Sequence, residues 1–210
     1  MTGKIIRQNE ARGGRGQSSY DVVYGYGQYA KPEKPLTQMT GTEVMAFQDK
    51  LREATKGKIG KGELGTSAVG AYQVIKPNLE EYYKQNPEEA GKLFNEEQQD
   101  KIYRWLIKDS VDQFLADGDK KKFKERITKT WEVFSKNENA KKQLDALLDN
   151  PAFAAGAGEE ESKKLTKEER QKKEKLLEQV LSNLYKDLTK EGDTTLMTVK
   201  GESVVEKAKE

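Results

Sequence analysis

The chain has 210 residues, of which 34% are hydrophobic and 35% are charged. This composition is too polar for one compact globule of the full length, so we expect part of the chain to be solvated helix or disorder. The 38 basic and 36 acidic side chains are well mixed and leave a net charge of +2, which argues against a nucleic-acid partner.

Cysteine and histidine are both absent from the sequence. Cysteine nucleophiles, Ser-His-Asp triads, zinc sites built on cysteine or histidine, and disulfide frameworks are therefore excluded. Carboxylates, lysine and tyrosine remain for acid–base chemistry, and glycoside cleavage is the hydrolytic reaction that normally uses carboxyl groups alone. The sequence implies no metal and no organic cofactor.

The N-terminal residues lack the hydrophobic stretch of a signal peptide. Residues 4–11 predict a short helix that ends at a glycine-rich turn over 13–16, so Glu10 is expected where a helix meets a loop. The run 19–29 is rich in β-branched and aromatic residues with interleaved glycines, which predicts a short strand or hairpin.

Residues 42–55 predict an amphipathic helix, because their apolar side chains recur at helical spacing and a threonine can cap the start. A glycine-rich loop over 56–65 then leads into the segment 66–75. No apolar run of about 18 residues occurs in the chain, so the sequence predicts no membrane span.

A second group of helices follows in the middle of the chain. Asn95 and Gln98 have the spacing of a capping box, and the residues beyond them present an apolar face. A further helix carries aromatic residues on one side over 123–134. These helices supply the large side chains of a core, so the folded domain is expected over 1–150.

The last third of the chain is predicted to be different in character. Residues 151–164, with a proline and many alanines and glycines, predict a hinge or linker. The segment 165–210 predicts a charged amphipathic helix, capped by Thr166 with Glu169, followed by a frayed tail. This helix is expected to pack either back on the domain or on a partner.

Three sequence blocks carry a likeness to a known family. They are Glu10 with the glycine-rich turn after it, Ser-Tyr-Asp-Val-Val-Tyr-Gly at 19–25, and Thr-Ser-Ala-Val-Gly-Ala-Tyr-Gln at 66–73. In their order and spacing the chain resembles the lysozyme-like lytic transglycosylases of tailed phages, of the lambda-phage endolysin type, over about residues 4–136. The resemblance implies an α+β fold, mainly helical with a small antiparallel β lobe, and a substrate groove between the lobes.

The resemblance implies that Glu10 is the single catalytic carboxyl group. Cleavage of a glycosidic bond requires a proton on the leaving oxygen, and a carboxyl group buried among apolar side chains can supply it near neutral pH. A hydrolase would need a second carboxylate, for which Asp21 is the nearest candidate. An aspartate beside a turn usually accepts hydrogen bonds from backbone N–H groups instead.

The resemblance also suggests residues that contact the glycan. Ser67, Tyr72, Gln73, Tyr26 and Asp21 are the expected substrate-binding residues, because polar and amphipathic side chains in a cleft can bind sugar hydroxyl and N-acetyl groups. Alternatives remain open for three of them. The tyrosine at 72 could be a core aromatic, the serine at 67 a helix cap, and the Gly-Tyr-Gly at 25–27 a hairpin turn.

The expected function is that of a peptidoglycan lytic transglycosylase. It cleaves the bond between N-acetylmuramic acid and N-acetylglucosamine, and the muramic acid 6-hydroxyl attacks to give a 1,6-anhydro product. The expected partners are the glycan strand and, through the C-terminal helix, other phage virion proteins. The alternatives are a hydrolysing muramidase and a non-catalytic phage virion structural or interaction module with a lysozyme-like fold.

The resemblance implies a phage-encoded protein that is either an endolysin or virion-associated. Its expected location is the phage virion or the host cytoplasm, with action on the cell wall in the periplasm. With no signal peptide predicted, another factor would have to deliver it there.

Overall fold

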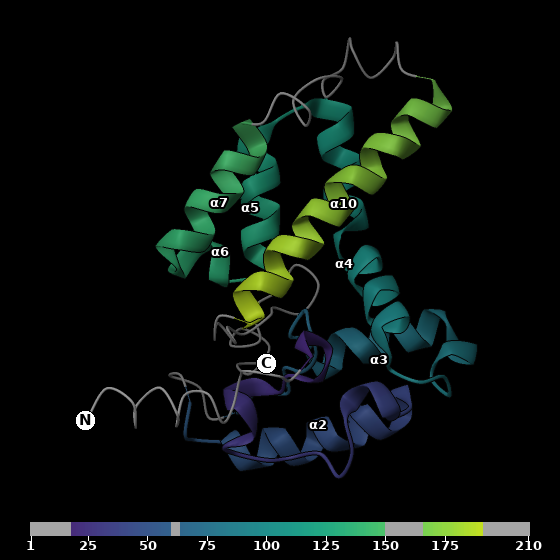
Figure 1. The fold of residues 1–210 in the computed structure, drawn as a ribbon, viewed down its shortest axis with the longest axis vertical. Coiled ribbons are helices and arrows are strands. Elements are labelled where there is room, and N and C mark those ends of the chain that lie inside the picture. Colours follow the sequence, from purple (N-terminus) through teal and green to yellow (C-terminus); the bar gives the residue numbers. More distant parts are fainter. Residues whose placement is uncertain (1–17, 60–63, 150–165, 191–210) are drawn as a thin grey trace.

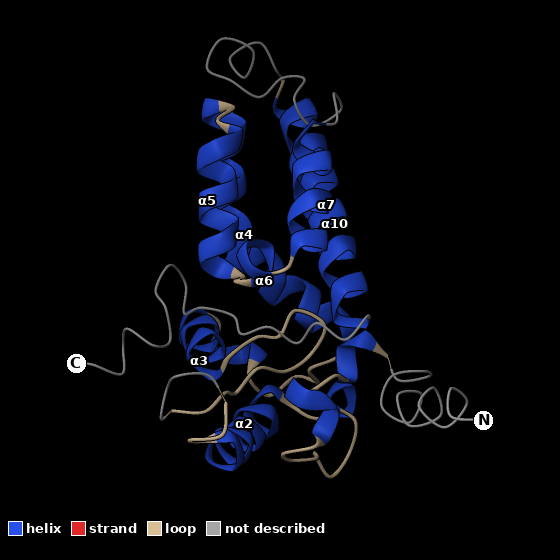
Figure 2. Cartoon of the chain, turned by 90° about the vertical axis from the view of Figure 1, so that its left-hand side faces the viewer, coloured by secondary structure: helices blue, strands red, loops and turns tan. Residues whose placement is uncertain are grey.

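The computed structural model describes residues 18–59, 64–149 and 166–190. The described part of the chain is mostly helical (Figures 1 and 2). The described helices are α2 (Gly41–Thr55), α3 (Lys76–Gln85), α4 (Glu96–Asp117), α5 (Lys120–Thr130), α6 (Val133–Lys136), α7 (Glu138–Asp149) and α10 (Lys167–Lys190). Helices α2 and α3 lie at one end of the molecule together with short 3-10 turns, α5, α6 and α7 lie at the other, and the long helices α4 and α10 run between the ends (Figure 1).

The expected α+β fold with an antiparallel β lobe is wrong. The described residues contain no strand, only three isolated antiparallel bridges, which join Val23 to Val69, Thr40 to Leu93 and Val69 to Val74. A mainly helical molecule was expected, but the lobe that was to carry the sheet is built from loops and 3-10 turns (Figure 2).

The run 19–29 shows why no hairpin forms. It folds into two short 3-10 turns, η1 (Ser19–Asp21) and η2 (Tyr24–Gly27), with extended backbone only between them. Gly25 and Tyr26 have φ values of 65° and 53°, in the left-handed region that ends a strand. The aromatic and β-branched residues correctly indicated extended backbone at Val22 and Val23. The glycines then turn the chain, so no second strand in the described residues pairs with this segment to form a hairpin.

The predicted helix over 42–55 is confirmed as α2. Thr40 caps it: its Oγ1 accepts a hydrogen bond from the Glu43 backbone N–H, and the Glu43 carboxylate accepts one from the Thr40 N–H, which completes a capping box. The buried face carries Val44, Phe47 and Leu51, as the apolar spacing requires.

The helix predicted after Asn95 is confirmed as α4, and the Asn95 side chain accepts a hydrogen bond from the Gln98 N–H at 3.0 Å. The helix predicted over 123–134 is instead divided in two. At Trp131 the backbone is extended (φ −128°, ψ 104°), so α5 ends before it and α6 begins after it. The Trp131 indole is 2% exposed and donates a hydrogen bond to the Tyr72 carbonyl oxygen at 3.2 Å, which holds this break in the core.

The C-terminal helix α10 packs back on the folded domain, along α4 (Figure 1). Its capping box is confirmed, because Thr166 Oγ1 accepts from the Glu169 N–H and the Glu169 carboxylate accepts from the Thr166 N–H. Leu177 and Leu181 are 1% and 3% exposed and belong to the main hydrophobic core. The hinge predicted over 151–164 lies outside the described residues.

One hydrophobic core runs through the described residues, from Tyr20 to Leu181. Aromatic side chains contribute the largest members of this core, while Trp105 is only partly buried and packs against it. No helix in the described ranges combines the length and apolarity needed to cross a membrane. The largest fully buried side chains include Trp131, Tyr72, Tyr103, Phe94, Phe114, Phe123 and Phe134.

Candidate functional site

Two of the three motif blocks lie side by side. Val23 and Val69 form an antiparallel bridge, the Tyr24 N–H donates to the Ala68 carbonyl oxygen at 3.1 Å, and the Gly70 N–H donates to the Val22 carbonyl oxygen at 2.7 Å. The chain therefore brings together the segments 19–25 and 66–73, which are far apart in sequence. Glu10, the third block, lies outside the described residues, so its catalytic role stays a prediction.

The second of these blocks closes on itself in a tight turn. Val69 and Val74 exchange backbone hydrogen bonds of 3.1 and 2.8 Å, and Gly70 and Gln73 both have positive φ, of 76° and 49°. A Cβ added to Gly70 would lie 2.3 Å from the Gln99 side-chain oxygen, so only glycine fits there.

Gln73 has an unusual environment at the end of this turn. It is a non-glycine residue in the left-handed region, a conformation that costs free energy and persists only where the surroundings impose it. Its side chain is fully buried and donates to the Gly70 carbonyl oxygen at 2.9 Å, while its Oε1 has no hydrogen-bond partner among the described residues. Such strain and such an orphaned acceptor are typical of functional positions.

Gln99 of α4 joins the two blocks, and the sequence analysis did not identify it. Its amide donates to the carbonyl oxygens of Tyr20 and Phe94, both at 2.9 Å, and accepts from the Ala71 N–H at 3.0 Å. Gln99 lies three residues before the buried Ile102 and is itself 1% exposed. A polar residue in line with the apolar face of a helix is the pattern that could have indicated it.

Gln48 of α2 also binds the backbone of this turn and its flanks. Its Nε2 donates to the carbonyl oxygens of Ser67 and Val74, at 2.8 and 2.9 Å. It is fully buried on the face that also carries Val44 and Leu51. Two glutamines on two helices thus hold the backbone over residues 67–74.

The remaining expected substrate-binding residues are bound within the protein or partly covered. Ser67 is 5% exposed, and its Oγ accepts from the Lys76 N–H at 2.9 Å, a capping contact with the first turn of α3. The Asp21 carboxylate accepts from the Thr37 N–H at 2.8 Å, the backbone role that its place beside a turn suggested. Tyr26 is partly exposed and lies in η2.

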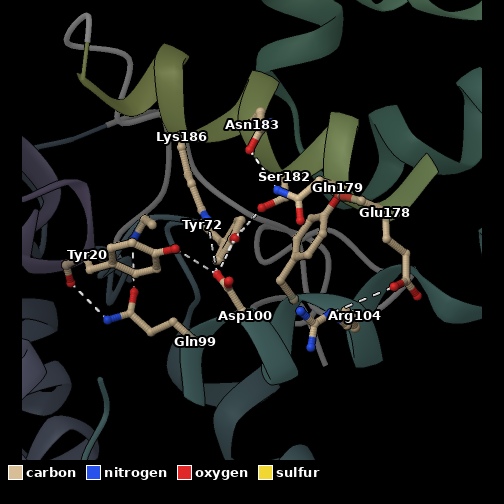
Figure 3. A network of polar contacts seen from close by, with 12 residues as sticks. Tyr20, Tyr72, Gln99, Asp100, Arg104, Glu178, Gln179, Ser182, Asn183 and Lys186 are labelled. Atoms are coloured by element: carbon tan, nitrogen blue, oxygen red, sulfur yellow. Dashed lines mark hydrogen bonds and ion pairs between the residues drawn. The ribbon is translucent and has the colours of Figure 1, made fainter. Parts of the chain in front are cut away.

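Tyr72 belongs to a polar cluster centred on Asp100 of α4 (Figure 3). The hydroxyls of Tyr72 and Tyr20 both donate to Asp100 Oδ1, at 2.6 and 2.9 Å, and the ammonium of Lys186 lies 3.2 Å from the same oxygen. The Tyr72 hydroxyl also shares a hydrogen bond with Ser182 Oγ. Tyr72 has no exposed surface, so here it is a core aromatic with a bound hydroxyl.

The electrostatics of the cluster keep its tyrosines neutral. Burial is the main cause that raises the pKa of both Tyr20 and Tyr72, and the Asp100 carboxylate raises both further. The Tyr72 ring stacks on Tyr103, with centroids 4.4 Å apart, and meets Tyr20 edge-on at 6.5 Å.

A cavity of about 340 Å³ lies beside this cluster, between α4 and α10. Its walls carry charges of both signs, and Arg104 Nε lies 3.7 Å from the Glu178 carboxylate across it (Figure 3). Burial raises the pKa of Glu178, Glu174 raises it further, and Arg104 and Lys108 lower it in part. The lining residues are Asp100, Tyr103, Arg104, Lys175, Glu178, Gln179 and Ser182.

The structure brings together some of the predicted substrate-binding residues but not all of them. Tyr72 and Gln73 lie in a segment that pairs with the run 19–29, which carries Asp21 and Tyr26. The Ser67 side chain instead binds the first turn of α3. No cluster of three or more carboxylates that could hold a metal ion occurs in the described residues. No family model, no curated protein and no solved structure matches the chain.

Proposed function

We propose that the chain is a peptidoglycan lytic transglycosylase that cleaves the bond between N-acetylmuramic acid and N-acetylglucosamine. The observation that carries the proposal is the pairing of the segments 19–25 and 66–73 through the Val23–Val69 bridge. These segments are two of the three blocks that resemble the family, and their contact makes one structural unit of what the sequence shows only as separate motifs.

The strain at the tip of this unit supports the proposal. The turn over 70–73 contains a buried glutamine with positive φ and an orphaned side-chain oxygen. Gln99 accepts from a backbone N–H within the turn, and Gln48 donates to the carbonyl oxygens of Ser67 and Val74, which flank it. Such strain costs free energy and clusters at functional sites, where groups must be held in fixed positions.

The residues available for glycan contact lie in the run 19–29, which includes the other paired segment. Tyr24 and Tyr29 are partly exposed, and their rings stack with centroids 6.1 Å apart. Tyr26 lies between them and is also partly exposed. Aromatic faces of this kind can bind the apolar faces of sugar rings, so we assign the glycan contacts to this segment and the positioning of the turn to Tyr72 and Gln73.

In the proposed reaction Glu10 acts first as an acid and then as a base. It protonates the glycosidic oxygen as the bond to the anomeric carbon breaks, and it then removes the proton from the muramic acid 6-hydroxyl as that oxygen attacks the same carbon. The product carries a 1,6-anhydro ring, and no water is consumed.

The test is mass spectrometry of the soluble products that the full chain releases from purified peptidoglycan. We expect anhydromuramoyl products from the wild type and none from Glu10→Gln. The matched control is Glu33→Gln, the same change at a side chain that is 93% exposed, which is expected to leave the products unchanged.

Other products would redirect the proposal. Reducing-end products would indicate a hydrolysing muramidase, and Asp21→Asn would then be the next variant, because asparagine keeps an oxygen for the Thr37 N–H and removes only the charge. A folded wild type that releases nothing from several wall types would contradict the enzyme and indicate a non-catalytic phage virion module.

A further inference from the structure

Asp100 is the point at which three hydrogen-bond donors from three segments of the chain meet. The hydroxyls of Tyr20 and Tyr72 and the ammonium of Lys186 all lie within 3.2 Å of one carboxylate oxygen, Oδ1 (Figure 3). Donors that converge on one ionised oxygen make strong, directional hydrogen bonds. Their geometry therefore fixes the three donor side chains relative to one another.

Two of the donors belong to the paired motif blocks. Tyr20 is the second residue of the segment 19–25, and Tyr72 lies in the turn next to the strained Gln73. The two rings meet edge-on, at an interplanar angle of 81°, with their hydroxyls directed to the same carboxylate. Asp100 thus ties the side chains of the two blocks together, as its neighbour Gln99 ties their backbones.

The third donor comes from α10, outside the region of resemblance. The Lys186 ammonium lies 4.7 Å from the centroid of the Tyr20 ring and 5.6 Å from that of Tyr72, so it contacts the carboxylate and both ring faces. Ser182, one turn earlier, shares the hydrogen bond of the Tyr72 hydroxyl. Lys186 neutralises a carboxylate whose side chain is only 28% exposed, which lowers the cost of placing that charge there.

Packing alone does not account for this chemistry. Phenylalanine in place of either tyrosine and an apolar residue in place of Asp100 would fill a similar volume without desolvating a charge. A polar network of this kind selects one orientation of its members, which apolar packing does less strictly.

We propose that Asp100 is a positioning residue of the candidate site, and that α10 completes the site by placing Lys186 and Ser182 on the tyrosines that Asp100 holds. This inference rests on the proposed function. Asp100 acts through Tyr20 and Tyr72, which fix the orientation of the turn over 70–73 against the segment that binds the glycan.

The test compares Asp100→Asn, Tyr72→Phe and the double variant in the full chain, with turnover measured per folded molecule on soluble glycan strands. We expect kcat to fall about tenfold in each single variant, because each removes one charge-assisted hydrogen bond. We expect no further loss in the double variant, because both changes break the same hydrogen bond. Asp112→Asn is the matched control, because it makes the same change on α4 at an exposed ion pair with Lys108.

A spectroscopic measurement accompanies the kinetics. With tyrosine labelled at the ring carbon that bears the hydroxyl, Asp100→Asn and Lys186→Met are expected to shift the carbon resonances of Tyr20 and Tyr72, while Asp112→Asn leaves them in place. Should Asp100→Asn not fold, Lys186→Met and Ser182→Ala replace it in both measurements, with the same non-additivity toward Tyr72→Phe expected.

Full kcat in a folded Asp100→Asn protein, or losses that add in the double variant, would overturn the positioning role while leaving the proposed function intact. A wild type without activity would refute the function instead. In that case only the carbon resonances test the cluster. Unchanged Tyr20 and Tyr72 signals in Asp100→Asn would overturn the inference, and shifted signals would support the hydrogen bonds of both tyrosines to Asp100.

Discussion

At the scale of single residues, the backbone of the candidate site depends on the side-chain amide of Gln99. This amide satisfies two carbonyl oxygens and one N–H that are otherwise enclosed, and it joins Tyr20 to Ala71. When a buried backbone group loses its hydrogen-bond partner, the folded state is destabilised by the full desolvation free energy of that group. The stability of the paired segments should therefore depend on the amide itself, beyond the volume that it fills.

Gln99→Leu should lower the free energy of unfolding by about 3 kcal/mol, because it leaves buried polar groups without partners. Urea denaturation followed by circular dichroism measures the change. The control is Gln113→Leu, at an exposed position of the same helix, for which we expect a change below about 0.5 kcal/mol. Equal stabilities of the two variants would contradict the role assigned to Gln99.

The sequence predicted the motif blocks but not the residues that hold them. Gln48 and Gln99 were missed because single glutamines in helices are usually solvated, and only their alignment with Val44 or Ile102 distinguishes them. Tyr72 was expected either at the glycan or in the core. The structure places it in the core, since it stacks on Tyr103, a contact between distant segments that no local pattern contains.

At the scale of elements, apolar spacing and capping residues predicted α2, α4 and α10, whereas the helix predicted over 123–134 is divided at Trp131 and α7 was not predicted. Asn95 and Thr166 cap the helices that the sequence assigned to them, and of the two threonines that could cap α2 the structure uses Thr40. The strand prediction failed because three successive residues, 25–27, have positive φ. Propensity scales describe the tendency of a residue to be extended, while the length of a strand depends on where the backbone turns.

The contact of α10 with α4 should depend on pH through Glu178. The pKa of this carboxyl is raised in the folded protein, chiefly by burial, so folding favours its protonated form. Its contribution to stability is therefore fully present below the unfolded pKa near 4.5 and is lost as the pH rises through the higher folded value. Glu174, Arg104, Lys108 and Asp112 are the charged groups that act on it.

Glu178→Gln should accordingly raise the free energy of unfolding at pH 7 relative to the wild type. The difference should shrink as the pH falls and should vanish below about pH 4, where the wild-type carboxyl is protonated in both states. Urea titrations at several pH values measure it. A variant that is less stable than the wild type at pH 7 would show that the ion pair with Arg104 outweighs burial.

At the scale of the whole molecule, the question is whether α10 is an appended helix or part of the domain. The sequence allowed the helix to pack either on the domain or on a partner, because a leucine stripe indicates that a helix has an apolar face but not what covers that face. The structure resolves this by contact: Leu177 and Leu181 lie in the same core as Tyr72 and Trp131. The polar cluster of Asp100 also joins α10 to the motif blocks.

One continuous core predicts one unfolding transition. Urea curves recorded by far-ultraviolet circular dichroism, which reports all helices, and by tryptophan fluorescence, which reports Trp105 and Trp131, are expected to coincide. Leu177→Ala should move both curves together and cost about 3 kcal/mol, because it leaves a cavity where α10 enters the core. The adjacent Leu176→Ala, at a side chain that is 44% exposed, should move neither. Separate transitions, or a Leu177→Ala protein as stable as Leu176→Ala, would show that α10 is not part of the folded domain. Coincident curves would show that α10 unfolds together with the domain that contains the candidate site.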